Sequence, residues 1–313
     1  MKQKYPVIKI TPMPYVLFDD IKHRLEWRKS FEYSKFPHPT WGQLKLLLGE
    51  LNFFISCVKK IKNFETNKSD YVVVYIGSCP GMHIPMIDIF FPGLTWAFAD
   101  PAQISPELQK FVTDNKFIYH KGYADTTWID SIKIRYPKKK FLFISDIRTA
   151  APGREPSTKN LLDDYKIQWD CLTALNPVAY TIKWRCPFPT DWPTKDKVYI
   201  FPGTVYVQAY AKPTSCELRL IHFGEINPSK IQEITKEDSI KIEQTMCYFN
   251  QVIRKSQIMN GPADLRFHDH LVAYDTAKNL VTYAWNVPEP ETSNARSIDK
   301  NYHIYKYIKG EII

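Results

Sequence analysis

The chain has 313 residues, of which 44% are hydrophobic and 14% aromatic, and this is enough apolar material for one large domain with a real core. Its 42 basic residues outnumber its 33 acidic residues, and basic charge together with many aromatic rings favours a nucleic-acid partner. The sequence has no signal-peptide core, no apolar run of about 18 residues that could span a bilayer and no C-x-x-C pair among its six cysteines. We therefore expect a soluble intracellular protein with reduced thiols, and no membrane partner, zinc knuckle or disulfide framework.

The first segments predict an irregular arm followed by a long helix. Prolines are frequent in the first 40 or so residues, which favours an arm around a short helical piece near residues 18–28. Over residues 41–61, apolar side chains recur at every third or fourth position, as on the buried face of an amphipathic helix. Lys45 lies near the start of this helix, where the helix dipole does not favour a cation.

Residues 71–83, YVVVYIGSCPGMH, predict a buried strand that enters a glycine-bracketed turn. Gly77 opens the turn and Gly81 closes it, so that the backbone can approach a ligand at the start of the next helix. Residues 94–100 predict a second buried strand that ends in Asp100, about twenty residues beyond the loop, where nucleotide-binding folds place an acid that binds ribose. The two signals together favour a nucleotide-type crevice.

Two further parallel strands are predicted next, over residues 116–125 with their turn and over 138–148. Asp146 lies at the carboxyl end of the second of these, so we expect it to face the same crevice as the glycine loop. Ser157 or Thr158 is the predicted N-cap of a helix over residues 161–175.

The remaining elements complete an α/β pattern. A fifth strand, VAYTIKWR, carries Lys183 among apolar residues, and Glu217 belongs to the second strand of a predicted hairpin over 204–210 and 215–223, joined through 211–214. Amphipathic helices are predicted over 228–258 and near 265–285. We predict a central, mostly parallel sheet flanked by helices, in a single domain over 1–313 with an N-terminal arm (about 1–40) and C-terminal helical additions (about 228–290).

Four charged residues interrupt otherwise apolar elements: Lys45, Asp146, Lys183 and Glu217. Because an isolated buried charge is costly, we expect these side chains to pair with one another or with a ligand. Two lysines and two acids balance in sign, so the pattern allows two structural salt bridges as well as a working site.

Several sequence blocks resemble one family. GQLKLLLGEL, VVYIGSCPGMHI, ISDIR, EPST, LNPVAYTIKWRCPFP and ELRL, in this order, resemble the poxvirus-type cap-specific mRNA (nucleoside-2′-O-)-methyltransferase and poly(A) polymerase small-subunit family, over residues 15–275. The resemblance implies a Rossmann-like S-adenosylmethionine-dependent methyltransferase fold. It also implies methyl transfer to the 2′-hydroxyl of the first transcribed nucleotide of capped RNA, which converts cap 0 to cap 1. The implied partners are capped mRNA and a poly(A) polymerase catalytic subunit, in the host cytoplasm or virion of a large DNA virus.

The family's catalytic Lys-Asp-Lys-Glu set falls on the same four residues. A ribose hydroxyl is a poor nucleophile, so a base must take its proton, and lysine can do so only when its pKa is lowered by burial and a neighbouring cation. We expect Lys183 to be the base and Lys45 to lower its pKa and steady the developing oxyanion. Asp146 and Glu217 would orient the two lysines, and no metal is required.

The resemblance also implies binding residues. For the cofactor they are Gln43, Tyr75, Gly77, Ser78, Pro80, Gly81, His83, Asp100, Ala124, Asp146 and Arg148. An arginine of the family is replaced by Ala102, which puts one adenosine contact in doubt. For the cap and RNA they are Trp27, Phe188, Asp191, Ser215 and Glu243. Two aromatic rings would sandwich cationic N7-methylguanine, and Asp191 would replace an edge-reading acid whose position holds Thr190.

Two other functions remain open from the sequence. A 2′-O-methyltransferase for internal RNA riboses would share the four charged residues but would not need Trp27 and Phe188. An RNA-binding processivity subunit of a viral poly(A) polymerase with a vestigial pocket would not need the four charged residues, all of which are present.

Overall fold

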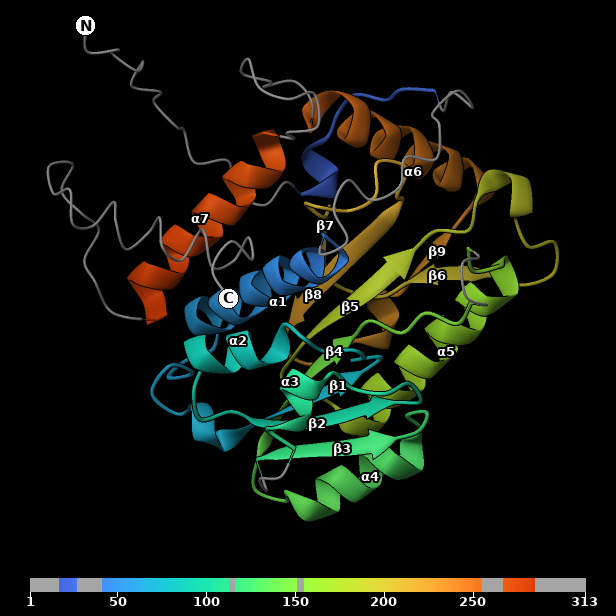
Figure 1. Ribbon diagram of the computed structural model, residues 1–313. Coiled ribbons are helices and arrows are strands. Elements are labelled where there is room, and N and C mark those ends of the chain that lie inside the picture. The colour runs from blue at the N-terminus through green and yellow to red at the C-terminus, as the bar shows by residue number, and fades with distance from the viewer. Residues whose placement is uncertain (1–16, 27–40, 113–115, 151–154, 255–266, 285–313) are drawn as a thin grey trace, which may run out of the picture.

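The computed structural model describes residues 17–26, 41–112, 116–150, 155–254 and 267–284 (Figure 1). The strands are β1 (Tyr71–Ile76), β2 (Thr95–Asp100), β3 (Phe117–Lys121), β4 (Lys140–Ser145), β5 (Ala179–Arg185), β6 (Val198–Ile200), β7 (Thr204–Tyr206), β8 (Glu217–Phe223) and β9 (Gln232–Ile234). The α-helices are α1 (Trp41–Lys60), α2 (Ile84–Phe90), α3 (Pro106–Gln109), α4 (Thr126–Arg135), α5 (Thr158–Leu175), α6 (Lys236–Tyr248) and α7 (Phe267–Ala284). Short 3-10 turns lie at Phe18–Asp20, Lys68–Asp70, Pro189–Asp191 and Pro228–Lys230, and a π-helical turn lies at Phe249–Ile253.

Seven strands form one sheet in the order β3-β2-β1-β4-β5-β8-β7. The five strands from β3 to β5 pair in parallel, whereas β8 pairs antiparallel with both β5 and β7. The chain runs outward from β1 to β3 and then returns to β4 on the other side of β1. The sheet therefore has a switch point between β1 and β4, and ligands of open α/β sheets bind at the carboxyl ends of the strands there. The expected central, mostly parallel sheet flanked by helices is confirmed.

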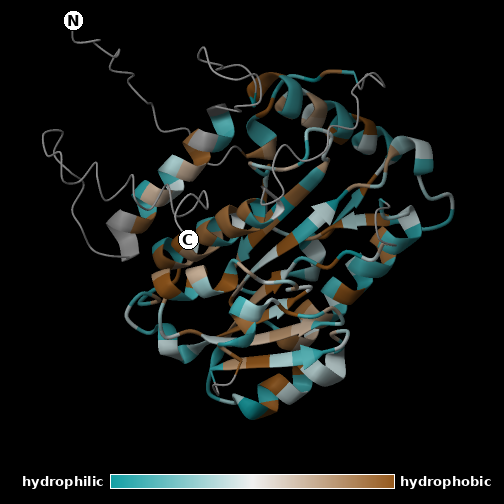
Figure 2. Cartoon of the chain, in the orientation of Figure 1, coloured by the Kyte–Doolittle hydropathy of each residue, from teal (hydrophilic) through white to brown (hydrophobic). Residues whose placement is uncertain are grey.

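The sheet is covered on both faces. All six residues of β1 are buried, and they alternate between two apolar clusters, as the two-residue period of a strand requires. One cluster joins β1 to α1, α2 and α7, and the other joins it to α4, α5 and α6. Figure 1 shows α1, α2 and α7 grouped on one face, and Figure 2 shows apolar residues along α1 and the central strands.

Three predicted elements differ from those observed. Residues 228–235 are not α-helical: Pro228–Lys230 forms a 3-10 turn and Gln232–Ile234 forms β9, which pairs antiparallel with Val198–Ile200. Thr235 caps α6 with a capping box to Asp238, which fixes the start of the helix at Lys236. The hairpin strand over 204–210 ends at Tyr206, and residues 207–216 form a longer connection in which Tyr210 has φ of 56°. Near residues 18–28, the described part contains only one 3-10 turn.

Two elements needed smaller corrections. Ser157 is the N-cap of α5, which therefore starts at Thr158 rather than at residue 161. The helix that was expected to run to residue 258 passes from α6 into the π-helical turn after Tyr248. The long helix after the arm, the strands over 71–76 and 95–100 and the final helix near 265–285 are confirmed.

Candidate active site

Asp146 stands between two cations at the end of β4. Lys183 on β5 lies directly opposite Arg219 on β8, and like charges at such positions repel one another. The Asp146 carboxylate relieves this repulsion: its Oδ2 lies 3.3 Å from the Lys183 Nζ, and its Oδ1 accepts a hydrogen bond of 2.6 Å from the Arg219 guanidinium. Lys183 also donates to the Asp146 main-chain oxygen at 2.7 Å. The strand pairing and one carboxylate therefore fix both cations.

Lys45 and Glu217 form the second ion pair. Lys45 comes from α1 and donates to the Oε1 atom of Glu217, at the start of β8. Gln208 donates to the same oxygen at 3.0 Å. Both charged side chains are mostly buried, with 14% and 12% of their surface exposed. The pair joins the helix on one face of the sheet to a strand at its antiparallel end.

The charges of this cluster shift one another's proton affinity. The pKa of Lys183 is lowered because burial outweighs the opposing effect of the Asp146 and Glu217 carboxylates, and the positive charges of Lys45 and Arg219 add smaller lowering effects. Burial would raise the pKa of Glu217, but the ammonium groups of Lys45 and Lys183 hold it well below its usual range. A lysine that loses its proton more readily than usual thus lies beside a carboxylate that stays ionised.

The cluster opens into a cavity of about 490 Å³. Its lining includes three of the four predicted catalytic residues, Lys45, Lys183 and Glu217, together with Arg148, Phe188, Thr190, Ser215 and Glu243. The two lysines, which come from sequence positions far apart, therefore face one space. Residues expected to bind the cap line the same cavity.

The cap-side residues differ in how they are held. The Arg185 guanidinium lies 4.7 Å from the centre of the Phe188 ring, and burial raises the pKa of the Glu243 carboxyl. The Ser215 hydroxyl accepts a hydrogen bond from the Glu217 main chain. Asp191 does not face the cavity: its carboxylate accepts hydrogen bonds from the main chain and the hydroxyl of Thr158, and Thr190 lines the cavity instead. Trp27 lies outside the described residues.

The glycine loop is packed closely between β1 and its neighbours. Gly77 has φ of 73°, and a side chain there would come within 2.6 Å of the Ile147 main chain, next to Asp146. Gly81 has φ of 69°, and a side chain there would meet Leu108 at 2.6 Å. The loop backbone can take this path only with glycine at both positions.

Asp100 holds the other side of the loop. Its carboxylate accepts hydrogen bonds from the main-chain N–H groups of Cys79 at 2.9 Å and Ala102 at 2.8 Å. The Gly122 N–H donates to the Asp100 main-chain oxygen, which brings the loop that contains Ala124 to the same edge. Ser78 is buried, and its hydroxyl has no hydrogen-bond partner among the described residues.

A buried polar cluster joins α1 to the two ends of the glycine loop. The His83 ring contacts Gln43 Oε1 at 3.0 Å through its Nδ1 and Glu50 at 3.0 Å through its Nε2. The Tyr75 hydroxyl donates to Glu50 at 2.6 Å. Three of the predicted cofactor residues are therefore linked through a fourth residue, Glu50. Arg148, by contrast, lines the 490 Å³ cavity and pairs with Glu155 at 3.0 Å.

The sequence reasoning missed Arg219, Gln208 and Glu50. Arg219 follows Glu217 by two residues, so it lies on the same face of β8, and like the four charges above it interrupts an apolar run. The buried set therefore contains a third cation in addition to the two lysines and two acids that the sequence indicated. Glu50 follows Gln43 by seven residues, or two helical turns, which was a usable signal. Gln208 lies in the irregular connection between β7 and β8, and no sequence pattern indicated its role.

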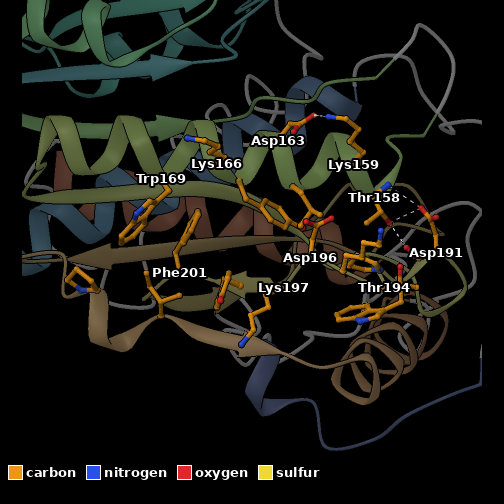
Figure 3. Close-up of a pocket in the computed structure, with 18 residues that line it drawn as sticks. Thr158, Lys159, Asp163, Lys166, Trp169, Asp191, Thr194, Asp196, Lys197 and Phe201 are labelled. Carbon is orange, nitrogen blue, oxygen red and sulfur yellow. Dashed lines mark hydrogen bonds and ion pairs between the residues drawn. The ribbon is translucent and has the colours of Figure 1, made fainter.

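A larger cavity lies on the other side of α5, against β6 (Figure 3). Its volume is about 1160 Å³, and its aromatic lining includes Trp169 and Phe201, whose rings stack with their centres 5.2 Å apart. Two of its lysines form exposed ion pairs, Lys159 with Asp163 at 2.7 Å and Lys197 with Glu233 at 2.7 Å. Of the described residues that were predicted to form the site, only Asp191 lines this cavity.

The described ranges of the chain contain neither a candidate membrane span nor a candidate metal site. None of the helices in these ranges is both long and apolar enough to cross a bilayer. Within the same ranges, no three histidine, cysteine, aspartate or glutamate side chains gather as a metal site would require.

Comparison with known proteins gives a consistent result. The family described as Poly A polymerase regulatory subunit matches residues 11–306. A cap-specific mRNA (nucleoside-2′-O-)-methyltransferase of Fowlpox virus (strain NVSL) is 33% identical over 273 residues, which cover 86% of this chain and 85% of the relative. A protein of the same description from Myxoma virus (strain Lausanne) is 32% identical over 272 residues, 85% of this chain and 78% of the relative. Among solved structures, human methyltransferase-like protein 13 in complex with SAH overlaps 72% of this chain and 98% of that chain, at 10% identity and a TM-score of 0.34, which is too low to carry an argument.

Proposed function

The chain belongs to the poly(A) polymerase regulatory subunit family, together with poxvirus cap-specific mRNA (nucleoside-2′-O-)-methyltransferases, and we propose that it methylates the ribose 2′-hydroxyl of the first transcribed nucleotide of capped RNA. This reaction converts cap 0 to cap 1. The single observation that carries the proposal is the cavity in which Lys45, Lys183 and Glu217 meet residues suited to bind a cap.

The residues around the glycine loop fit S-adenosylmethionine. The buried Ser78 hydroxyl lacks a partner among the described residues, and Asp100 places a carboxylate at the end of β2, where ribose hydroxyls would be bound. In this proposal the Asp146 carboxylate, which follows β4, lies near the sulfur of the cofactor, because a carboxylate favours a positively charged sulfonium. The bound cofactor supplies an electrophilic methyl group. The chain's own residues have to orient the RNA hydroxyl and remove its proton.

Lys183 acts as the general base in this proposal. Its Nζ takes the proton of the 2′-hydroxyl while that oxygen forms its bond to the methyl carbon and the methyl–sulfur bond breaks. Burial, together with the neighbouring cations Lys45 and Arg219, lowers the pKa of Lys183, so that its amine loses its proton more readily. The hydrogen bond to the Asp146 main-chain oxygen and the Asp146 carboxylate orient this amine.

Lys45 and Arg219 supply fixed positive charge. Each is held by a carboxylate, Lys45 by Glu217 and Arg219 by Asp146, so neither has to reorganise as negative charge develops on the ribose oxygen. Lys45 reaches the cavity that would contain that oxygen, which makes it the closer stabiliser of the two.

The cap would be bound at the other end of the cavity. The exposed face of Phe188 offers a stacking surface for cationic N7-methylguanine, and the half-buried Glu243 carboxylate can accept hydrogen bonds from the guanine edge. Trp27 remains the proposed second ring of the sandwich. Asp191 is not part of this proposal, because Thr158 occupies its carboxylate.

The family description also supports a second role. Because the matched family is that of poly(A) polymerase regulatory subunits, we propose a poly(A) polymerase catalytic subunit as a protein partner. Co-purification of the two proteins, co-expressed from one viral source, is expected, and failure to form a complex would contradict this role. The relatives are viral proteins, in keeping with the predicted source in a large DNA virus.

Radioactive methyl transfer from S-adenosylmethionine to short RNA tests the enzyme function. Transfer is expected with N7-methylated capped RNA, with the label in the 2′-O-methylated first nucleotide after nuclease digestion, and not with the same RNA lacking a cap. Equal transfer to capped and uncapped RNA would favour the methyltransferase for internal riboses. No transfer at any pH from mildly acidic to alkaline would leave only the RNA-binding role.

A further inference from the structure

Glu50 is a buried carboxylate without an assigned role. Its side chain is 1% exposed, and it lies on α1 among apolar neighbours of the sheet face. Among the described residues its hydrogen-bond partners are the Tyr75 hydroxyl at 2.6 Å and the Nε2 atom of His83 at 3.0 Å. A carboxylate in such surroundings is costly to bury, so an apolar side chain would be expected at this point of the core unless the acid has a specific use.

The two donors come from opposite ends of the glycine loop. Tyr75 is the fifth residue of β1, two residues before Gly77, and His83 is the N-cap of α2, two residues after Gly81. One carboxylate thus ties both ends of the loop to α1. Because the loop is already constrained by close packing at both glycines, a shift of either end would move its backbone as a unit.

The same helix presents two functional side chains. Gln43 contacts the other nitrogen of the His83 ring at 3.0 Å, and Lys45 reaches Glu217 on β8. Glu50 lies two helical turns from Gln43, so its contacts fix the position of α1 along its axis relative to β1. Glu50 does not line the cavity of about 490 Å³, so it does not itself face the RNA.

We propose that Glu50 is a positioning residue for the cofactor site: it locks the glycine loop, through Tyr75 and His83, to the helix that presents Gln43 and Lys45. The inference rests on the proposed function, since it takes S-adenosylmethionine as the ligand of this loop. Glu50 acts through Tyr75 and His83 and does not touch cofactor or substrate.

Glu50→Ala and Glu50→Gln separate this role from simple stability. In Glu50→Ala both donors lose their acceptor, and the affinity for S-adenosylhomocysteine is expected to fall at least about tenfold. In Glu50→Gln the amide oxygen can still accept from Tyr75 and the amide N–H can donate to His83 Nε2. The His83 Nδ1–H then donates to Gln43, so the geometry survives and most of the affinity returns.

Asp88→Ala is the matched control. Asp88 is a mostly buried acid on the same short helix, α2, but it accepts from Lys116 at 2.7 Å and from Trp96 and does not touch the loop. Asp88→Ala is expected to lower the melting temperature without changing the dissociation constant for S-adenosylhomocysteine, when binding is measured well below the melting temperature of each variant.

Isothermal titration of the full-length protein with S-adenosylhomocysteine, without RNA, decides the outcome. A tenfold loss in Glu50→Ala, recovery in Glu50→Gln and no change in Asp88→Ala would support the inference. Wild-type affinity in Glu50→Ala, or the same loss in Asp88→Ala, would overturn it. If Glu50→Ala does not fold, Tyr75→Phe replaces it and is expected to weaken binding severalfold; unchanged binding would overturn the inference. No binding by the wild-type protein would overturn the proposed function and the inference together.

Discussion

The two cavities that flank α5 contain similar side chains but differ in how their charges are paired. In the catalytic cavity, Lys45 pairs with a residue 172 positions away, and Lys183 with one 37 positions away. In the outer cavity of Figure 3, Lys159 pairs with Asp163, one helical turn away, and its side chain is 83% exposed. The larger cavity thus contains the ordinary surface pairs, and the smaller one contains the buried pairs that join distant elements.

This difference in pairing is a better guide to function than cavity volume. Exposed pairs one turn apart on a helix add little to stability, and they need no function to explain them. A buried pair is often no more stable than apolar packing, because the cost of desolvating two charges offsets their attraction. When α1, β5 and β8 each contribute a buried charge to one cavity, and Asp146 after β4 pairs with one of these charges, chemistry is a better explanation than stability.

Lys183→Ala should have the largest effect. Loss of the general base is expected to lower kcat about a thousandfold, while the dissociation constant for S-adenosylhomocysteine stays unchanged, because the amine acts only in the transition state. Single-turnover methyl transfer and cofactor titration measure the two quantities. The matched control is Lys166→Ala on the outer face of α5, which should transfer methyl at the wild-type rate. A loss of cofactor affinity equal to the loss of kcat would contradict the assignment.

The pH dependence of kcat tests the electrostatics. The neutral amine of Lys183 is the active form, so the rate should rise with pH until the pH passes its lowered pKa and then level off. Lys45→Ala removes a cation that lowers this pKa and leaves the Glu217 carboxylate, which raises it, so the rising limb should move to higher pH. The rate in the rising limb should fall about tenfold for each pH unit of displacement. A limb that stays in place or moves to lower pH would show that Lys45 does not tune Lys183.

Glu243 should have a smaller, cap-specific effect. Burial raises the pKa of this carboxyl, and the ionised form is the one that accepts hydrogen bonds from guanine. Affinity for a cap analogue, measured by fluorescence quenching, should therefore decrease as the pH falls through the raised pKa. Glu243→Gln should lower the affinity about tenfold at neutral pH and remove the decrease. If the variant keeps the wild-type pH dependence, another group titrates.

Local patterns predicted much of the fold but failed where contacts between distant residues decide. The apolar stripe of α1 and the uninterrupted apolar run of β1 were sufficient, because α1 buries one face and β1 is buried along its whole length. Residues 232–234 have apolar side chains at helical spacing nearby, yet they pair with β6, a strand whose presence the sequence did not predict. The first strand of the hairpin was predicted too long and its connection too short, because Gln208 lies in an irregular connection and donates a hydrogen bond to Glu217. Irregular connections of this kind have no periodic pattern of apolar residues from which their structure could be predicted.

The candidate site shows the same difference between what local patterns predict and what only contacts between distant residues decide. A charge inside an apolar element was a sufficient signal to predict that Lys45, Lys183, Asp146 and Glu217 form ion pairs. The same signal was present at Arg219, where β8 alternates charged and apolar residues, but only the register of β8 against β5 shows that it faces Lys183. For Asp191, the sequence offered an acid next to the expected position and could not show that Thr158 occupies its carboxylate.

The outer cavity should show the smallest effects, and this prediction tests the comparison most directly. Lys159 and Lys197 line a cavity with stacked aromatic rings, which is also a pattern typical of single-stranded RNA binding. Their exposed ion pairs, Lys159 with Asp163 and Lys197 with Glu233, indicate instead that their charges are already neutralised. Lys159→Ala combined with Lys197→Ala should therefore leave the affinity for capped RNA, and its salt dependence, unchanged. If the slope of log affinity against log salt fell by about two in this double variant, both lysines would contact phosphates. The presence of exposed ion pairs would then not distinguish a surface that binds no RNA from one that does.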